Sequence, residues 1–328
     1  MNNTIEITVP DNLQNERLDV ILSRLIDVIP SRSFAAKLIA NKQVLVDDKY
    51  VKSSYKLKEL QKISIDLSFL ETVNSEPIGE KIDLDIIFED NDLIIINKPA
   101  GMVVHPGAGV HSGTLVNAIL AHCGVTLPSL GLPSRAGIVH RLDRDTSGVM
   151  VVAKSQIALT NLSKQFADHS QTRIYHTLIY GNILPVSGKI ETWHGRDPKN
   201  RIKYAVQPEG KGKKAILSYN KLKTFLDEKI SLVACQLYTG RTHQIRVQLS
   251  NLGHSILGDA LYTNNANELN SNKELKALIN KNAQRQMLHA VHLGFKHPVT
   301  NVDMSFQSPY PQDFNNLLLL LEAKGKKF

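Results

Sequence analysis

The chain has 328 residues, a formal net charge of +8 and a sequence pI of about 9.3. Its hydrophobic content of 42%, with charges of both signs, is typical of a folded globular protein and excludes a disordered chain. The excess of Lys and Arg favours a polyanionic partner, with nucleic acid ahead of a membrane surface.

Only two cysteines occur, Cys123 and Cys235, so the sequence excludes a disulfide framework and indicates a reducing compartment. The N-terminus lacks the basic and apolar regions of a secretory signal. No apolar run approaches the ~20 residues that span a bilayer. We therefore expect a cytoplasmic protein with no membrane partner.

The first 76 residues have the pattern of a small, basic α/β module. Residues 2–9 alternate as a strand, and apolar side chains in 17–26 recur at helical spacing. Residues 31–39 predict a second helix with Ser31 as its N-cap, and 44–46 and 63–65 predict strands. The cations spread over these elements favour phosphate contacts. Three short segments resemble the S4 RNA-binding domain in order and spacing: 17–19, 31–33 and 44–47.

A second domain is expected after a polar segment with Pro and Gly at 72–80, which gives domains 1–76 and 77–328. Patterning in the second domain predicts a strand-rich unit with a few helices. The expected strands are 84–89, 93–97, 137–139, 149–153, 173–181 and 232–237. The expected helices are 114–122, 158–167 and one from about 311.

The glycine-rich segment 107–113 precedes one of these helices, as in nucleotide-binding loops. Its third glycine, however, comes one place too late for Gly-x-Gly-x-x-Gly, and no Gly-Lys-Ser/Thr follows. We expect a sharp turn here without a nucleotide.

Residues 140–148 are the most densely charged stretch between apolar runs: His-Arg-Leu-Asp-Arg-Asp-Thr-Ser-Gly. Polar side chains packed between core elements cost stability unless each is paired. The stretch therefore predicts a functional site, with a structural salt-bridge cluster as the alternative.

A second charged region, 196–223, carries nine Lys and Arg residues against Asp197 and Glu209. Its Pro and Gly residues favour a hairpin, and Tyr204 and Tyr219 lie among the cations. Cations interleaved with aromatic rings suit a folded RNA. The alternative is a solvated charged loop.

Carboxylates are the best candidates for chemistry, because the sequence has neither a Gly-x-Ser-x-Gly elbow nor a His-Glu-x-x-His metal site. Asp143, Asp145 and Thr146 resemble the nucleophile motif of haloacid-dehalogenase-type phosphatases. Arg144 between the two carboxylates would repel the Mg²⁺ that such enzymes need. The residues alone do not choose between Asp143 and Asp145.

The arginines suggest a different use of the same carboxylates. A carboxylate beside cations stays ionised at neutral pH and acts as nucleophile or base. Arg241 offers a bidentate fork for a carboxylate, and Tyr175 offers a ring on which a base can stack. These groups together suit chemistry at the sugar–base bond of an RNA nucleotide.

Residues 140–148 resemble the hallmark of the RluA/RluD-type pseudouridine synthases, and the likeness covers essentially the whole chain. Arg144, Ser147 and Gln248 depart from the residues common in the family, and none is at the catalytic position. Segment 105–109 points to the RluD branch, which modifies large-subunit (23S) ribosomal RNA. The other matching segments follow in the family's order: 97–101, 103–109, 173–181, 240–246, 258–259 and 285–290.

The resemblance implies an α+β fold: a mixed, mostly antiparallel sheet with a catalytic cleft, plus the small N-terminal α/β S4 domain. It implies an isomerase that detaches a uracil and rejoins it to the sugar through C5, with no cofactor and no metal. Asp143 would be the catalytic carboxylate, Tyr175 the base-stacking ring, and Arg241 the ion-pair partner of Asp143. His140 and Arg141 are expected to contact the substrate.

The expected partner is large-subunit ribosomal RNA or its assembling particle, bound by a monomer. Two alternatives remain open. One is a non-catalytic RNA-binding or ribosome-assembly factor that uses the same surfaces. The other is the Mg²⁺-dependent phosphatase with an Asp nucleophile.

Overall fold

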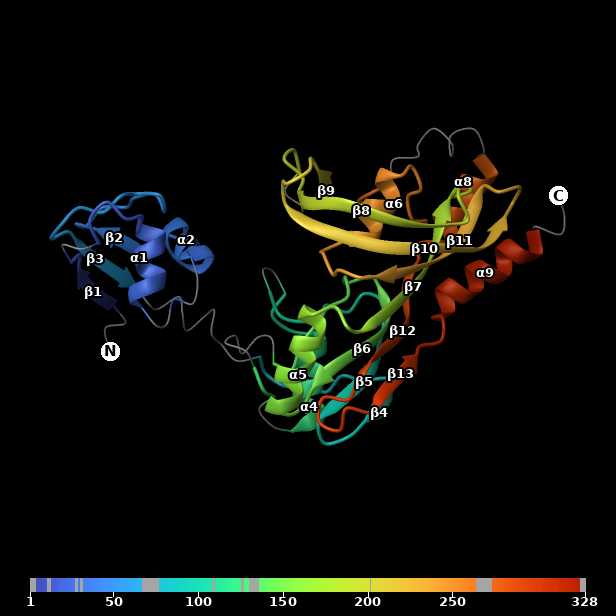
Figure 1. Cartoon of the computed structure of the whole chain (residues 1–328), viewed down its shortest axis with the longest axis horizontal. Coiled ribbons are helices and arrows are strands. Elements are labelled where there is room, and N and C mark those ends of the chain that lie inside the picture. The colour runs from blue at the N-terminus through green and yellow to red at the C-terminus, as the bar shows by residue number, and fades with distance from the viewer. Residues whose placement is uncertain are drawn as a thin grey trace. The chain divides into compact units, whose positions relative to one another are not determined.

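The chain folds as two compact units that divide between Glu76 and Pro77 (Figure 1). A computed structural model describes residues 4–10, 13–26, 29, 32–66, 77–107, 110–124, 127–129, 136–200, 202–263 and 273–324. Within these ranges, no helix is both long enough and apolar enough to cross a membrane.

The first unit packs two helices on a three-stranded antiparallel sheet of order β1-β3-β2. The predicted N-cap Ser31 lies outside the described residues. Asp19, which is 5% exposed, accepts hydrogen bonds from Arg17 at 2.9 Å and from Arg32 at 3.3 Å, and so ties the starts of the two helices together. The elements are β1 (Thr4–Thr8), α1 (Leu18–Leu25), α2 (Arg32–Ala40), β2 (Val44–Val46) and β3 (Lys62–Asp66).

The second unit is built on one ten-stranded mixed sheet, of order β4-β5-β6-β12-β7-β11-β10-β8-β9, with β13 paired to β12. All pairs are antiparallel except β6 with β12. Its strands are β4 (Ile86–Glu89), β5 (Leu93–Lys98), β6 (Ser147–Ala153), β7 (Thr172–Tyr180), β8 (Ser187–Arg196), β9 (Tyr204–Gln207), β10 (Lys213–Phe225), β11 (Ile230–Leu237), β12 (Leu288–Lys296) and β13 (Asp303–Gln307).

The helices flank this sheet along both halves of the unit (Figure 1). Apolar residues of α4 and α5 pack into the same core as β5 and β6, whose side chains are nearly all buried. A strand buried on both faces has a continuous apolar sequence, as residues 149–153 do. The helices are α4 (Leu115–Cys123), α5 (Gln156–Ala167), α6 (Gln244–Asn251), α8 (Lys273–Asn282) and α9 (Gln312–Lys324).

Most elements predicted from patterning are confirmed within a few residues. The exception is 137–139, where the structure has only an isolated bridge between Ile138 and Val152. Gly137 explains the difference: its φ of +71° turns the chain, and a Cβ there would lie 2.4 Å from the carbonyl oxygen of Ala153. The segment crosses β6 at one point and then leaves it.

The parallel pair of β6 and β12 joins the two halves of the sheet through only two residue pairs, Ser147 with His289 and Gly148 with Ala290. Gly148 has a φ of +119°, and a Cβ there would lie 2.2 Å from the carbonyl oxygen of Ala290. Only glycine permits this approach. The predicted charged stretch therefore ends where the two halves of the sheet meet.

Candidate active site

A pocket of about 460 Å³ lies in the second unit, bordered by the loop before β6, by β7 and by the loop before α6. It brings together all five residues singled out by the sequence: His140, Arg141, Asp143, Tyr175 and Arg241. Segments far apart in the chain thus meet around one cavity.

The loop that carries Asp143 is held by cations beneath its backbone. Lys98 is fully buried, and its Nζ donates to the carbonyl oxygens of Pro99 at 2.6 Å, Met102 at 2.9 Å and Arg144 at 3.0 Å. Nη1 of Arg285 donates to the carbonyl oxygen of Asp145 at 2.9 Å. The two carbonyl groups that follow Asp143 are therefore fixed from inside the protein.

An ion pair fixes the Asp143 side chain itself. Nη1 of Arg246 donates to Oδ2 of Asp143 at 3.0 Å. The same guanidinium donates to both carboxylate oxygens of Asp259, at 2.7 and 3.0 Å, and the Asp259 side chain is fully buried. Arg246 thus holds Asp143 in one orientation and keeps a cation beside its carboxylate.

The expectation that Arg241 pairs with Asp143 is wrong. Nε of Arg241 donates to the carbonyl oxygen of Lys214 at 3.0 Å, and the ion pairs of Asp143 within the described ranges are with Arg246 and His243. Arg241 lies in the loop before α6, whereas Arg246 lies inside the helix, which turns it toward Asp143.

The sequence did contain a signal for Arg246. It stands between Ile245 and Val247 in a segment whose side chains are buried, and a buried arginine needs a counter-charge. Asp259, thirteen positions later, meets that need.

Tyr175 comes from β7, where side chains alternate between the two faces of the sheet. It is 6% exposed and lines the pocket. Burial raises the pKa of the Tyr175 hydroxyl, which therefore stays protonated. The ring is a neutral, mostly apolar surface in a pocket lined by charged groups.

His140 lies beneath the loop and Arg141 at its surface. Nε2 of His140 accepts a hydrogen bond from the backbone N–H of Val151 at 3.1 Å, and its ring stacks on Phe166 at 4.5 Å. Burial lowers the pKa of His140 to about 3, so the ring is neutral. His140 supports the loop, while Arg141 is exposed at the pocket.

His243 and Tyr262 form a second polar contact near Asp143. Nδ1 of His243 lies 2.8 Å from the hydroxyl of Tyr262, and its Nε2 lies 3.9 Å from Oδ1 of Asp143. Burial lowers the pKa of His243 despite the nearby carboxylate. Sequence reasoning missed Tyr262, because nothing in its local pattern marks it.

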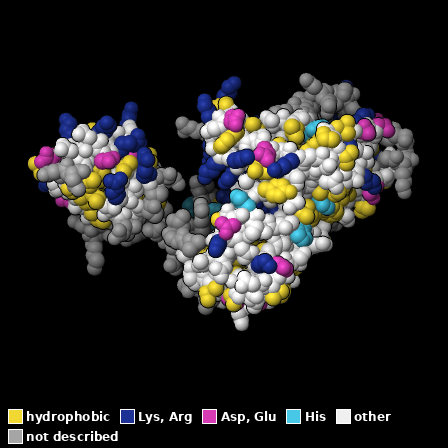
Figure 2. Space-filling view, viewed as in Figure 1, with side chains coloured by type: hydrophobic (Ala, Val, Ile, Leu, Met, Phe, Trp, Pro, Cys, Tyr) yellow, Lys and Arg dark blue, Asp and Glu magenta, His cyan; other side chains and the backbone are white. Residues whose placement is uncertain are grey.

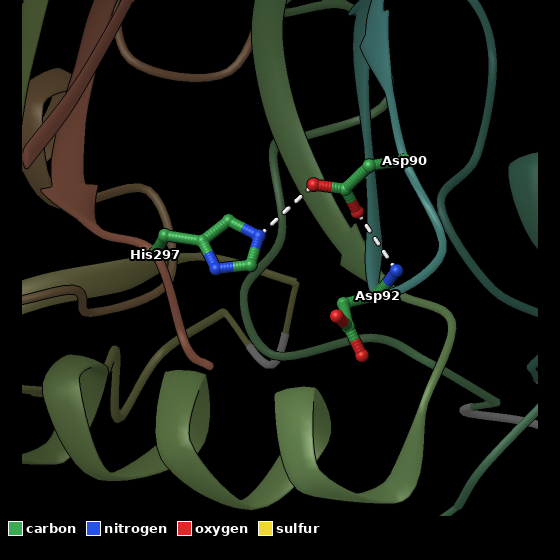
Figure 3. Close-up of side chains that lie close together, drawn as sticks. All are labelled: Asp90, Asp92 and His297. Carbon is green, nitrogen blue, oxygen red and sulfur yellow. Dashed lines mark hydrogen bonds and ion pairs between the residues drawn. The ribbon is translucent and has the colours of Figure 1, made fainter. Parts of the chain in front are cut away.

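One group in the described part of the chain has the spacing of metal ligands: Asp90, Asp92 and His297 (Figure 3). Nδ1 of His297 accepts from the backbone N–H groups of Val299 at 3.2 Å and Thr300 at 3.1 Å. Nε2 therefore carries the proton and donates to Oδ2 of Asp90 at 2.9 Å. The arrangement ties two turns together and leaves neither ring nitrogen for a metal.

The predicted basic hairpin, residues 196–223, includes the end of β8, all of β9 and most of β10. These three strands lie in the order β10-β8-β9, so β9 and β10 pair with opposite edges of β8 rather than with each other. Figure 2 shows Lys and Arg side chains gathered over this region. Its exposed cations include Arg196, Lys199, Lys211, Lys213, Lys214 and Lys223. The ring of Tyr204 lies 4.7 Å from Cζ of Arg196 and stacks on His194 at 5.4 Å.

Comparison with known proteins places this site in a family. The family model for RNA pseudouridylate synthase matches residues 92–251, and the S4 domain model matches residues 16–61. The chain is 40% identical to ribosomal large subunit pseudouridine synthase D of Zymomonas mobilis, over 98% of this chain and 99% of that protein. It is 36% identical to the uncharacterized RNA pseudouridine synthase YlyB of Bacillus subtilis, over 98% of this chain and all of that protein.

Among solved structures, human RNA pseudouridylate synthase domain containing 4 is similar in fold, with a TM-score of 0.55 and 24% identity over 72% of this chain and 92% of that one. The 40% identity to the Zymomonas mobilis protein extends over nearly the full length of both chains. The chain belongs to the RNA pseudouridine synthase family.

Proposed function

We propose that this protein converts uridines of large-subunit ribosomal RNA to pseudouridine, with Asp143 as the catalytic carboxylate. The observation that carries the proposal is the carboxylate of Asp143, held by Arg246 in a pocket that Tyr175 also lines. The relatives named for the large ribosomal subunit support the choice of RNA.

The residues divide the reaction among them. Asp143 acts on the sugar of the target nucleotide while the bond between N1 and C1′ breaks. The freed uracil turns and forms a new bond from C5 to C1′; C5 then loses its proton and N1 ends protonated, so that the product is an isomer of the substrate. The ring of Tyr175 provides the face on which the uracil stacks. A base inside a stem must leave its stack to reach the pocket, at a cost of a few kcal/mol that RNA contacts offset.

Those contacts come from the basic region at β8, β9 and β10, from arginines at the pocket and from the first 76 residues. The strands β8, β9 and β10 lie in the same unit as the pocket, and Arg141 and Arg241 line the pocket itself. Residues 1–76 form the S4 RNA-binding domain and residues 77–328 the catalytic domain. The enzyme acts as a monomer, in the cytoplasm, on ribosomal RNA or its assembling particle.

The test compares two aspartates of one loop. Asp143→Asn removes the carboxylate that lines the pocket. It should lower the rate of pseudouridine formation by at least ~10³-fold while RNA binding is retained. Asp145→Asn is the matched control, because the Asp145 side chain is 46% exposed and does not line the pocket.

Pseudouridines are mapped in ribosomal RNA from a deletion strain complemented with each variant. Pseudouridine that persists with Asp143→Asn would refute the catalytic role. A non-catalytic assembly factor predicts that the deletion strain retains every pseudouridine, and a phosphatase predicts activity that a chelator abolishes.

A further inference from the structure

Arg173 is a buried cation at the pocket that the proposed reaction does not yet use. It lies on β7 two residues before Tyr175, and both side chains are on the buried face of that strand. Arg173 is 6% exposed and lines the pocket together with Tyr175 and Asp143.

Among the residues that the structure describes, none provides a counter-charge for the guanidinium of Arg173. Its Nε and Nη2 are buried without a hydrogen-bond partner, and its side chain makes no ion pair with the described residues. The other buried arginines of the site differ. Arg246 holds two carboxylates, and Arg285 holds Asp313 and backbone carbonyl groups.

The surroundings nevertheless hold this group in place. Cζ of Arg173 lies 5.7 Å from the centre of the Phe166 ring. Gly240 lies against the guanidinium: a Cβ built on Gly240 would be 2.8 Å from Nη1 of Arg173. A side chain at position 240 would therefore displace the guanidinium. Burial lowers the pKa of Arg173, but an arginine remains charged in a protein. A fixed, buried and unpaired cation destabilises the free protein.

We propose that Arg173 binds a backbone phosphate of the nucleotide that enters the pocket, an inference that rests on the proposed function. Four arginines line the pocket, Arg141, Arg173, Arg241 and Arg246, and the carboxylate that lines it, Asp143, is already paired. The pocket therefore lacks an anion, and RNA supplies one with every nucleotide.

The charge also decides between two parts of the nucleotide. A uracil carbonyl is neutral and would leave the buried charge uncompensated, whereas phosphate oxygens neutralise it and fit the guanidinium fork in a bidentate way. Two residues of a strand span about 7 Å, so a nucleotide stacked on Tyr175 has a phosphate within reach of Arg173.

The test combines protein and RNA substitutions. The probe is a ribosomal RNA stem-loop with a mapped target uridine, in which a neutral methylphosphonate replaces the phosphate on either the 5′ or the 3′ side of that uridine. Binding and single-turnover rates are measured for the wild type, Arg173→Gln and Arg173→Lys. Arg241→Gln is the matched control, because Arg241 lines the same pocket.

For the wild type, one of the two methylphosphonates should weaken binding about tenfold or more, the loss expected for a charge-assisted hydrogen bond. For Arg173→Gln the same replacement should change binding less than about twofold, while Arg241→Gln keeps the wild-type sensitivity. Arg173→Lys should be more sensitive to this methylphosphonate than Arg173→Gln but less sensitive than the wild type, because lysine restores the charge without the planar fork.

A second measurement separates ligand binding from a structural role. Removing an unpaired buried charge should raise the Tm of the RNA-free protein by about 2 to 4 °C in Arg173→Gln. A side chain that only supports the fold predicts a lower Tm.

The proposal is overturned if the wild type is active and each methylphosphonate weakens binding to the wild type and to Arg173→Gln by the same factor. A further RNA carries 4-thiouridine at the target position, which alters a carbonyl group of the base. The proposal is also overturned if this substitution weakens binding to the wild type but not to Arg173→Gln, because Arg173 would then contact the base. A wild type that makes no pseudouridine in the unmodified stem-loop would refute the proposed function itself.

Discussion

Arg246 joins Asp143, at the pocket, to Asp259, which is fully buried: its Nη1 lies 3.0 Å from Oδ2 of Asp143 and its Nε lies 2.7 Å from Oδ2 of Asp259. The desolvated Asp259 fixes the guanidinium, and the guanidinium fixes Asp143. The orientation of the proposed catalytic group therefore depends on a residue that does not line the pocket.

Arg246→Met should destabilise the fold and abolish activity. The substitution leaves Asp259 buried without its cation, which costs about 3 to 5 kcal/mol of the free energy of unfolding. Urea unfolding measures the loss. Arg241→Met is the control, since Arg241 makes no ion pair with a carboxylate of the described chain, and it should cost less than about 1 kcal/mol. Equal losses in the two variants would contradict the assignment of Arg246.

Acid should weaken the fold through two histidines, His140 beneath the loop and the fully buried His289. Burial lowers the pKa of His140 to about 3 and that of His289 to about 4. An unfolded histidine has a pKa of about 6.5, so below that pH the unfolded state binds more protons than the folded state. The free energy of unfolding therefore has its highest value above pH 6.5. Between pH 6.5 and pH 5 it falls by about 2 kcal/mol for each of these histidines.

This loss is measured by urea unfolding at pH 7 and pH 5. His289→Gln should reduce the difference between the two pH values by about 2 kcal/mol. His111→Gln should leave it unchanged, because the His111 side chain is exposed. An unaltered pH dependence in His289→Gln would show that this histidine does not carry the effect.

Gly148→Ala should prevent folding or cost more than about 4 kcal/mol, because the new Cβ would overlap the backbone of Ala290 and separate β6 from β12. Gly101 provides the control. Its φ of +87° is also in the left-handed region, but nothing lies within 4 Å of a Cβ there. Gly101→Ala should therefore cost only ~1–2 kcal/mol. Thermal unfolding of both variants distinguishes a close approach from backbone strain alone.

Deletion of residues 1–76 should weaken RNA binding and reduce its dependence on salt. Each phosphate contact releases counterions from the RNA, so fewer contacts release fewer counterions. The remaining chain keeps its own core and the pocket. The slope of log K against log salt is measured for the full chain and the shortened one. A slope that does not change would contradict the assignment of RNA contacts to this unit.

Local patterning predicted the positions of most elements because their burial is local. Residues 149–153 of β6 are all apolar and buried, and the first half of β7 alternates between half-buried and buried side chains. The ion pair of Asp143 could not be predicted in the same way. Arg241 and Arg246 are equally charged in the sequence, and only the course of α6 decides which of them faces Asp143.

The partner of β6 was equally beyond local reasoning. Pairing of β6 with β12 joins Gly148 to Ala290, which are far apart in the chain and carry no matching pattern. Arg173 shows the same limit: its charge is plain in the sequence, but its lack of a partner is visible only once the pocket is assembled.

Strand β12 lies between β6 and β7 in the sheet although it follows both, as well as β8 to β11, in the chain. A growing polypeptide therefore leaves the ribosome with the facing edges of β6 and β7 unfilled. Those edges can close only after residues 288–296 have emerged. Leu288 of β12 is also one of the residues that line the pocket, so the pocket is complete only after nearly the whole chain has been synthesised.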